Sequence, residues 1–263
     1  MPKTIIQDLE VNYDVAGDGP ALLFLHGLGS SGQDWAPQVE TFRDRYKCIT
    51  YDVRGHGRSG KPPGPYSMAQ FAADAAGLLD HLDRPSANLV GLSLGGMIAF
   101  QMAVNFPERV NSMVIINSGP AVVPVTFKEK MAVWQRQYMF RLLSMKRIGV
   151  TIGGRLFPDE DQSEIRAQFV ARWSENDKRA YLAATQAIIG WSVLEHITTL
   201  TMPTLVIAAD QDYTPVAAKE AYVRQMPNAE LVVVPDARHA VNFAQPEKVN
   251  PLIAAFLEKF VLT

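Results

Sequence analysis

The sequence predicts an α/β fold in which helices flank a mostly parallel central sheet, with a helical cap inserted between two core strands. Two observations support this prediction: short apolar runs alternate with longer amphipathic runs, and the alternation stops once, in a long stretch of helical pattern. Strands that alternate with helices pair in parallel and carry helices on both faces of the sheet. We therefore expect a core of residues 1–120 and 197–263 and a cap of residues 121–196.

The apolar runs of strand length define the predicted sheet. Ala21–Leu25 is typical, because it is too short for a helix and ends abruptly at His26 and Gly27, which indicates a buried strand. The first two runs follow one another without a helix, so they predict an antiparallel edge. The predicted strands are Thr4–Leu9, Val11–Ala16, Ala21–Leu25, Tyr46–Tyr51, Ala87–Leu92, Val110–Asn117, Thr204–Ala209 and Glu230–Val234.

The longer runs between these strands carry the start signals of helices. Ser67 begins the first run, and Thr214 with Pro215 supplies an N-cap and a proline at the first position of the third. The predicted core helices are Ser67–Leu82, Leu94–Asn105, Pro215–Gln225 and Pro246–Phe260.

The predicted cap contains no convincing strand and many large apolar side chains. These side chains would roof a site built on the core, and ligand sites are mostly apolar. We select Trp134, Tyr138 and Trp191 from the cap, together with Val241 from the core, as candidate substrate-binding residues.

Composition and charge argue against several classes of partner. The net charge is −2 and no basic stripe is present, so a nucleic acid is not expected. No apolar stretch approaches the ~20 residues that span a bilayer, and the N-terminus does not resemble a signal peptide, so we expect a cytoplasmic protein without a membrane partner. The sequence permits an oligomer but does not predict one. Cys48, the single cysteine, lies in an apolar run and is expected to be a buried, inert thiol.

Ser93 stands among glycines at the junction of a predicted strand and a predicted helix. The run Gly91-Leu92-Ser93-Leu94-Gly95 fits the nucleophile elbow, in which a serine occupies a strained turn from strand to helix. The residues two before and two after the serine must be small, because the turn brings their backbone against the neighbouring strand and helix. The alternative is a helix start that needs glycine only for packing. A strand before the serine and a helix after it favour the elbow.

A serine nucleophile needs a base that is held in place by a third group. Folds with this elbow carry the partners in the order serine, acid, histidine, and of the five histidines only His239 satisfies that order. The loop after Thr204–Ala209 offers two acids, Asp210 and Asp212. Asp210 directly follows the strand and could simply make a turn, so we favour Asp212 as the acid.

Together these motifs resemble those of the α/β-hydrolases over nearly the whole chain. In that family the aspartate at the position of Asp212 is the usual triad acid, which supports that choice. The resemblance also implies that the backbone N–H groups of Leu28 and Leu94 form the oxyanion hole, and it implies no cofactor. We find no cluster of metal ligands in the sequence. The matching stretches are "HGLGSSG", "YDVRGHGRSGKP", "GLSLGG", "ADQDYTP" and "RHAVNFAQPEKVN".

The resemblance implies a carboxylic ester hydrolase of the carboxylesterase type. Ser93 would attack an ester carbonyl, His239 would accept the serine proton and Asp212 would orient the imidazole, giving an acyl-enzyme that water hydrolyses. The expected partner is a small to medium, largely apolar ester or lactone. "RGHGRSGKPPGPYSMAQFAAD" and "GLSLGGMIAF" are similar to 3-oxoadipate enol-lactonases, although His26-Gly27 stands where those enzymes usually have Asn-Ser.

Three other functions fit parts of the sequence. A cofactor-free perhydrolase or haloperoxidase shares the triad, but commonly carries a proline where this chain has Gly29. A dinucleotide-binding protein would explain Gly27, Gly29 and Gly32 after a strand, with Asp52 ending the next strand, but that fingerprint should open directly into a helix. A receptor that keeps the hydrolase fold and turns over slowly is excluded by no motif, because fold does not fix function.

Overall fold

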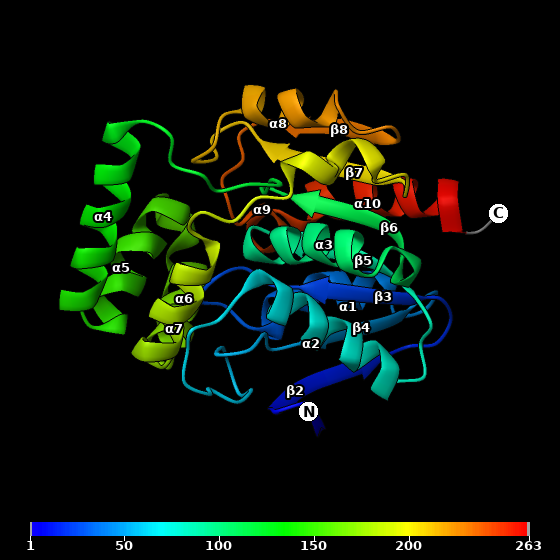
Figure 1. The fold of residues 1–263 in the computed structure, drawn as a ribbon, viewed down its shortest axis with the longest axis horizontal. Helices are drawn as coiled ribbons and strands as arrows, with labels where there is room; N and C mark the ends of the chain where they lie inside the picture. The colour runs from blue at the N-terminus through cyan, green and yellow to red at the C-terminus, as the bar shows by residue number, and fades with distance from the viewer. Residues whose placement is uncertain (1, 262–263) are drawn as a thin grey trace.

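The computed structural model describes residues 2–261, so residue 1 and residues 262–263 of the predicted core lie outside the described residues. Within that range the strands form one eight-stranded sheet in the order β1-β2-β4-β3-β5-β6-β7-β8 (Figure 1). The pairs β1–β2 and β2–β4 are antiparallel and the remaining neighbours are parallel, which confirms the predicted fold class. The strands are β1 (Lys3–Ile6), β2 (Leu9–Ala16), β3 (Ala21–Leu25), β4 (Lys47–Tyr51), β5 (Ala87–Leu92), β6 (Val110–Ile116), β7 (Thr204–Ala209) and β8 (Ala229–Val234).

The first hairpin differs from the sequence prediction. The predicted strand Thr4–Leu9 is divided, because β1 ends at Ile6 and Leu9 already begins β2. Gln7 has φ +54°, a left-handed conformation that reverses the chain, and Ile6 pairs with Leu9 across the turn. The turn residues are Gln7 and Asp8; aspartate is common in turns but glutamine is not, so the sequence marks this turn only weakly.

The predicted core helices are present, with small differences at their ends. A capping box starts α2, since the Gln70 N–H donates to Ser67 Oγ over 3.2 Å and the Ser67 N–H donates to the Gln70 side chain over 3.0 Å. At α8 the cap is Pro215 rather than the predicted Thr214, whose hydroxyl is bound to Asp212 and Lys219. The core helices are α1 (Ala36–Phe42), α2 (Met68–His81), α3 (Leu94–Asn105), α8 (Val216–Val223), α9 (Val241–Ala244) and α10 (Pro246–Val261).

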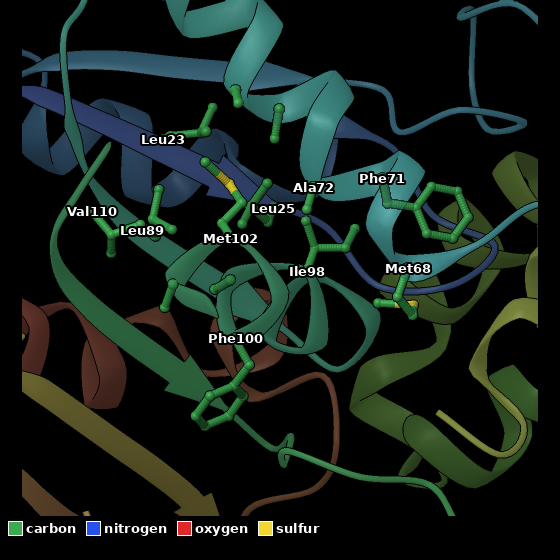
Figure 2. Close-up of a cluster of buried hydrophobic side chains, with 14 of the residues drawn as sticks. Leu23, Leu25, Met68, Phe71, Ala72, Leu89, Ile98, Phe100, Met102 and Val110 are labelled. Atoms are coloured by element: carbon green, nitrogen blue, oxygen red, sulfur yellow. The ribbon is translucent and has the colours of Figure 1, made fainter. Parts of the chain in front are cut away.

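The sheet separates two hydrophobic layers. Successive residues of β3 point to opposite faces, so Leu23 and Leu25 pack with α2 and α3, while Leu22 and Phe24 pack with α1 and α10. Figure 2 shows the first layer, in which Leu23 and Leu25 lie among side chains of β5 and α3, while Phe71 lies beside Met68 on α2. Strands buried on both faces are apolar throughout, which explains the continuous hydrophobic runs of the sequence.

Residues 121–196, which we call the helical insert, connect β6 to β7. Figure 1 shows its helices grouped together at one end of the sheet. The two chain segments at its base run side by side, because the Val122 N–H donates to the Trp191 carbonyl over 2.8 Å and the Val193 N–H donates to the Pro120 carbonyl over 2.8 Å. A third hydrophobic cluster, which includes Phe140 and Trp173, lies mainly in the insert and also contains Ala240 of the core. Its α-helices are α4 (Phe127–Leu142), α5 (Met145–Leu156), α6 (Ser163–Ser174) and α7 (Lys178–Ile188).

Two further sequence expectations can be compared with the described residues. Across residues 2–261, no helix combines the length and the apolar character that crossing a membrane requires. Cys48 lies buried on β4, and burial raises the pKa of its thiol to about 12, as expected for an inert cysteine.

Candidate active site

Ser93 lies on the sharp turn between β5 and α3. Its backbone has φ +53° and ψ −115°, a conformation that costs energy in a residue with a side chain and that occurs at functional sites. A Cβ on Gly91 would stand 2.5 Å from the Gly95 carbonyl carbon, and a Cβ on Gly95 would stand 1.9 Å from the Leu25 carbonyl oxygen. Glycine is therefore required on both sides of the serine, as the elbow motif predicts.

His239 and Asp212 come together from the loops that follow β8 and β7. His239 Nδ1 lies 2.6 Å from Asp212 Oδ1, and the Asp212 side chain is completely buried. Because Nδ1 is engaged by the carboxylate, Nε2 is the ring nitrogen that remains available to exchange a proton. Ser93 and His239 line the same cavity. The structure thus brings together the three residues that the sequence selects.

Asp212 is held by more partners than the sequence suggests. Lys219 Nζ lies 2.7 Å from Asp212 Oδ2, Thr214 Oγ1 donates to the same oxygen over 2.7 Å, and the Tyr213 N–H donates to Oδ1 over 2.8 Å. Burial by itself would raise the pKa of Asp212, but the bonds from His239, Lys219 and Thr214 outweigh burial and hold that pKa below its ordinary value. Asp212 consequently stays ionised beside the imidazole.

Asp210 has a different environment from Asp212. Its two carboxylate oxygens accept the backbone N–H groups of Asp236 and Ala237 over 3.1 and 3.0 Å. These bonds lower the pKa of Asp210 and join the end of β7 to the turn after β8. Asp210 therefore organises the loop that carries His239.

Sequence reasoning missed several residues that fix this geometry. Asn117, directly after β6, donates to the His239 carbonyl over 2.8 Å and accepts the Ala209 N–H over 2.8 Å. Ser118 Oγ donates to the Ser93 carbonyl over 2.6 Å. The Tyr213 ring stacks on His239 with centroids 4.0 Å apart. Only the position of these residues in the chain could have identified them. They follow the ends of parallel strands, and the carboxyl ends of such strands meet at one edge of a sheet, where a site forms.

The cavity that holds Ser93 and His239 has a volume of about 440 Å³. The core contributes its polar wall, and the helical insert contributes a largely apolar wall. The apolar residues from the insert include Ile152, Leu156, Phe157, Phe169 and Trp173. This composition is typical of a pocket for a small organic ligand.

The four candidate substrate-binding residues do not line this cavity. Trp134 and Tyr138 are 59% and 52% exposed and stack on one another outside it. Trp191 packs against the core and donates its indole N–H to Gln101 over 2.7 Å, while Val241 is buried in the layer under the sheet. Aromatic residues of the insert do line the cavity, as the sequence suggests, but they are other residues, such as Phe157, Phe169 and Trp173.

The predicted oxyanion residues lie beside the serine. Leu28 lines the cavity from the turn after β3, where the Ser30 N–H donates to the Gly27 carbonyl over 3.2 Å and Gly29 has φ +78°. Leu94 is the first residue of α3, whose N-terminus carries the positive end of the helix dipole. Both backbone N–H groups therefore belong to structures that follow the ends of neighbouring strands.

The glycines after β3 do not form a dinucleotide fingerprint. A 3₁₀ turn at Gly32–Trp35 separates β3 from α1. Asp52, which would bind a ribose, is buried and accepts the N–H groups of Gly32 and Arg58 and the side chain of Asn12. In the described part of the chain, no group of three or more His, Cys, Asp or Glu residues is arranged to hold a metal ion.

Comparisons with known proteins agree with this architecture. The family model described as "alpha/beta hydrolase fold" matches residues 20–146. Over 261 residues the chain is 32% identical to 3-oxoadipate enol-lactonase 2 of Acinetobacter baylyi, covering 97% of this chain and 95% of the relative. The chain belongs to the α/β-hydrolase family.

Two further similarities show the range of this α/β-hydrolase's relatives. It is 28% identical over 259 residues to a putative carbamate hydrolase, RutD, of Caulobacter segnis, with 94% of each chain covered. The crystal structure of the enol-lactonase from Burkholderia xenovorans LB400 superposes with a TM-score of 0.91 at 25% identity, covering 98% of this chain and all of that one. These similarities support a hydrolytic activity for this protein, and the names of the relatives indicate that they cleave different kinds of bond.

Proposed function

We propose that this α/β-hydrolase cleaves carboxylic esters, including lactones, through an acyl-enzyme on Ser93. The observation that carries the proposal is the chain of groups around one cavity: Ser93 on a strained elbow, His239 in the same cavity, and a buried, ionised Asp212 bonded to His239 Nδ1. A serine hydroxyl becomes a nucleophile when an adjacent base is oriented by a third group.

The reaction follows from these positions in two halves. Ser93 Oγ attacks the carbonyl carbon as its proton passes to His239 Nε2, and the negative charge on the carbonyl oxygen is stabilised by the N–H groups of Leu28 and Leu94. Collapse of this intermediate releases the alcohol, which takes the proton from His239. A water molecule then loses a proton to His239 and attacks the acyl carbon. Collapse of this second intermediate breaks the bond to Ser93 Oγ, which takes the proton back from His239, and the acid is released.

The cavity wall favours small to medium, largely apolar substrates. A volume of about 440 Å³ accommodates a compact ester, and the aromatic and aliphatic side chains of the insert offer hydrophobic contact to its acyl or alcohol group. The name of the Acinetobacter relative supports an enol-lactone as a second candidate substrate, since a lactone is an internal ester. Because one relative is named a putative carbamate hydrolase, carbamates are the substrates with which ester hydrolysis should be compared.

Gly29 distinguishes this site from the perhydrolase alternative. A Cβ at this position would stand 2.5 Å from the Trp173 ring, and Gly29 has φ +78°, which a proline ring cannot adopt, so the proline that perhydrolases commonly carry there does not fit this turn. The turn that holds Leu28 therefore requires glycine at position 29, which supports an ester hydrolase over a perhydrolase.

The decisive experiment combines a substrate panel with labelling of the serine. We expect hydrolysis of acyl esters from acetyl to octanoyl and of enol-lactones, slow or no hydrolysis of matched carbamates, and labelling of Ser93 by a fluorophosphonate probe. Ser93→Ala should lose about 10⁶-fold in kcat while remaining folded. Retained activity in that variant would refute the mechanism, and an unlabelled Ser93 with no turnover would favour a receptor.

A further inference from the structure

The end of α6 in the helical insert is attached to the Gly27–Ser30 turn of the core. Asn176, two residues beyond α6, donates its side-chain N–H to the Gly29 carbonyl oxygen over 2.7 Å. The Asn176 backbone N–H donates to the Trp173 carbonyl over 3.2 Å, which fixes Asn176 against the helix end. The turn that holds Leu28 is thus hydrogen-bonded to a residue from a different part of the fold.

Trp173 makes a second contact with the same turn. Gly29 adopts a left-handed conformation, and a Cβ placed on it would stand 2.5–2.9 Å from three atoms of the Trp173 ring. The indole therefore packs directly on the Gly29 backbone, with no room for a side chain between them. Trp173 is 4% exposed and belongs to the hydrophobic cluster of the insert, so its ring is held in place from behind.

An ion pair provides a third connection between α6 and the turn. Arg172 lies 2.7 Å from Asp34 Oδ1, and the Ser30 hydroxyl donates to the other oxygen of Asp34. Asp34 is largely buried at the cavity wall, where a charge pair is screened less than at the surface. Three residues at the end of α6 therefore contact the second half of the turn: Asn176 and Trp173 at Gly29, and Arg172 at Ser30 through Asp34.

We propose that Asn176 is a positioning residue for the oxyanion hole: by fixing the Gly29 carbonyl, it holds the Leu28 N–H in the orientation that the reaction requires. This inference rests on the proposed function, in which the Leu28 N–H stabilises the negative charge that develops on the carbonyl oxygen. Such donors act only when they lie 2.7–3.1 Å from the oxyanion. A displacement of ~1 Å costs on the order of 10²-fold in rate.

The same contacts couple the position of α6 to the turn that carries Leu28. If α6 moves away, the turn loses the Asn176 bond, the Trp173 surface and the Arg172 ion pair together. The insert then acts on the chemical step through the backbone of Gly29, in addition to forming the apolar wall of the cavity.

Asn176→Ala is the direct test, measured as kcat and KM on a short ester and as the inhibition constant of a boronic acid that forms a tetrahedral adduct with Ser93. We expect kcat to fall about tenfold, less than the 10²–10³ of losing a donor outright, with KM changed less than about twofold. Boronic acid affinity should fall by a factor similar to kcat. Asn176→Asp, which presents an oxygen to the Gly29 carbonyl, should lose more than the alanine variant.

Two matched variants serve as controls. Asn228→Ala removes a similar bond, from the Asn228 amide to the Thr201 carbonyl over 2.6 Å, away from the cavity. Ser174→Ala removes a hydroxyl on α6 that donates to the Val170 carbonyl of the same helix over 2.6 Å. Both should keep wild-type kcat and boronic acid affinity. Unchanged kcat and affinity in folded Asn176→Ala would overturn the inference, as would an equal loss in the controls.

Folding and the proposed function are checked separately. Thermal unfolding followed by circular dichroism identifies an unstable variant; if Asn176→Ala is unstable, Asn176→Leu, which removes the donor but keeps a side chain of similar shape, carries the kinetic test with the same expected losses. If wild-type protein neither hydrolyses esters nor reacts with the fluorophosphonate, the proposed function fails and this inference fails with it. If wild-type protein does both and Asn176→Ala equals it, only the inference fails.

Discussion

The cavity has two walls that are fixed in different ways. On the core side, the side chains of Ser118 and Asn117 donate hydrogen bonds to the backbone carbonyls of Ser93 and His239. On the insert side, Phe157 and Phe169 are held by the packing of rings whose centroids lie 5.5 Å apart. A hydrogen-bonded wall fixes the positions of reacting atoms, whereas a packed apolar wall sets the shape of the space beside them. We therefore expect changes in the core to remove turnover for every substrate and changes in the insert to alter which substrate is preferred.

The largest effect in this comparison is expected from the two aspartates of the core. Asp212→Asn should lower kcat on the order of 10⁴-fold, because an amide cannot hold His239 in the tautomer that accepts a proton at Nε2. Asp210→Asn should lower kcat less than about tenfold, since the Asp210 carboxylate accepts backbone N–H groups of the loop and is not bonded to His239 in the described residues. Steady-state kinetics on one short ester compare the two variants.

The outcome separates a chemical role from a structural one. The unfolding temperatures of both variants should be close to that of the wild-type protein, so that both are folded under the assay conditions. A larger loss of kcat in Asp210→Asn than in Asp212→Asn would reverse the assignment of the acid.

The core site could be predicted because its chemistry is tied to backbone requirements that leave marks in the sequence. Gly91 and Gly95 are small because other backbone atoms occupy the space of their side chains, and this requirement identifies Ser93 between them. His239 and Asp212 follow strands of the same sheet, so their order in the chain predicts their meeting. Asn117, by contrast, looks like any strand-end asparagine until its partners are known.

The wall from the insert could not be predicted at the level of residues. Trp134 and Trp173 are the same residue type on amphipathic helices, yet Trp134 is exposed and Trp173 lines the cavity. Which face of α4 or α6 meets the cavity depends on how the helices pack against one another, and local periodicity does not encode that arrangement. On α4 the cavity is reached by Arg136, which points away from the face that carries Trp134 and Tyr138.

A change in chain-length preference is expected from α5. Ile152 lines the cavity and is partly buried, so Ile152→Phe fills space that a longer acyl group would occupy. The ratio of kcat/KM for octanoyl and acetyl esters should fall about tenfold, because even one methylene group in an apolar pocket contributes about 10–200-fold. Val150→Phe is the matched control, since Val150 lies on the same helix, is exposed and does not line the cavity. An equal shift in both variants would show that Ile152 affects the pocket only through the stability of α5.

The smallest effect is expected on the outer face of α4. Trp134 and Tyr138 stack with ring centroids 5.6 Å apart and both are more than half exposed. Trp134→Ala and Tyr138→Ala should each change kcat/KM by less than about twofold for short and long esters, because exposed substitutions usually alter free energies by only ~0.5 kcal/mol. The same ester series used for Ile152→Phe measures this. A loss of kcat/KM that grows with acyl-chain length in either variant would mean that the outer face of α4 contacts the substrate. The part of the insert that shapes the cavity would then include this outer face as well as the inner one.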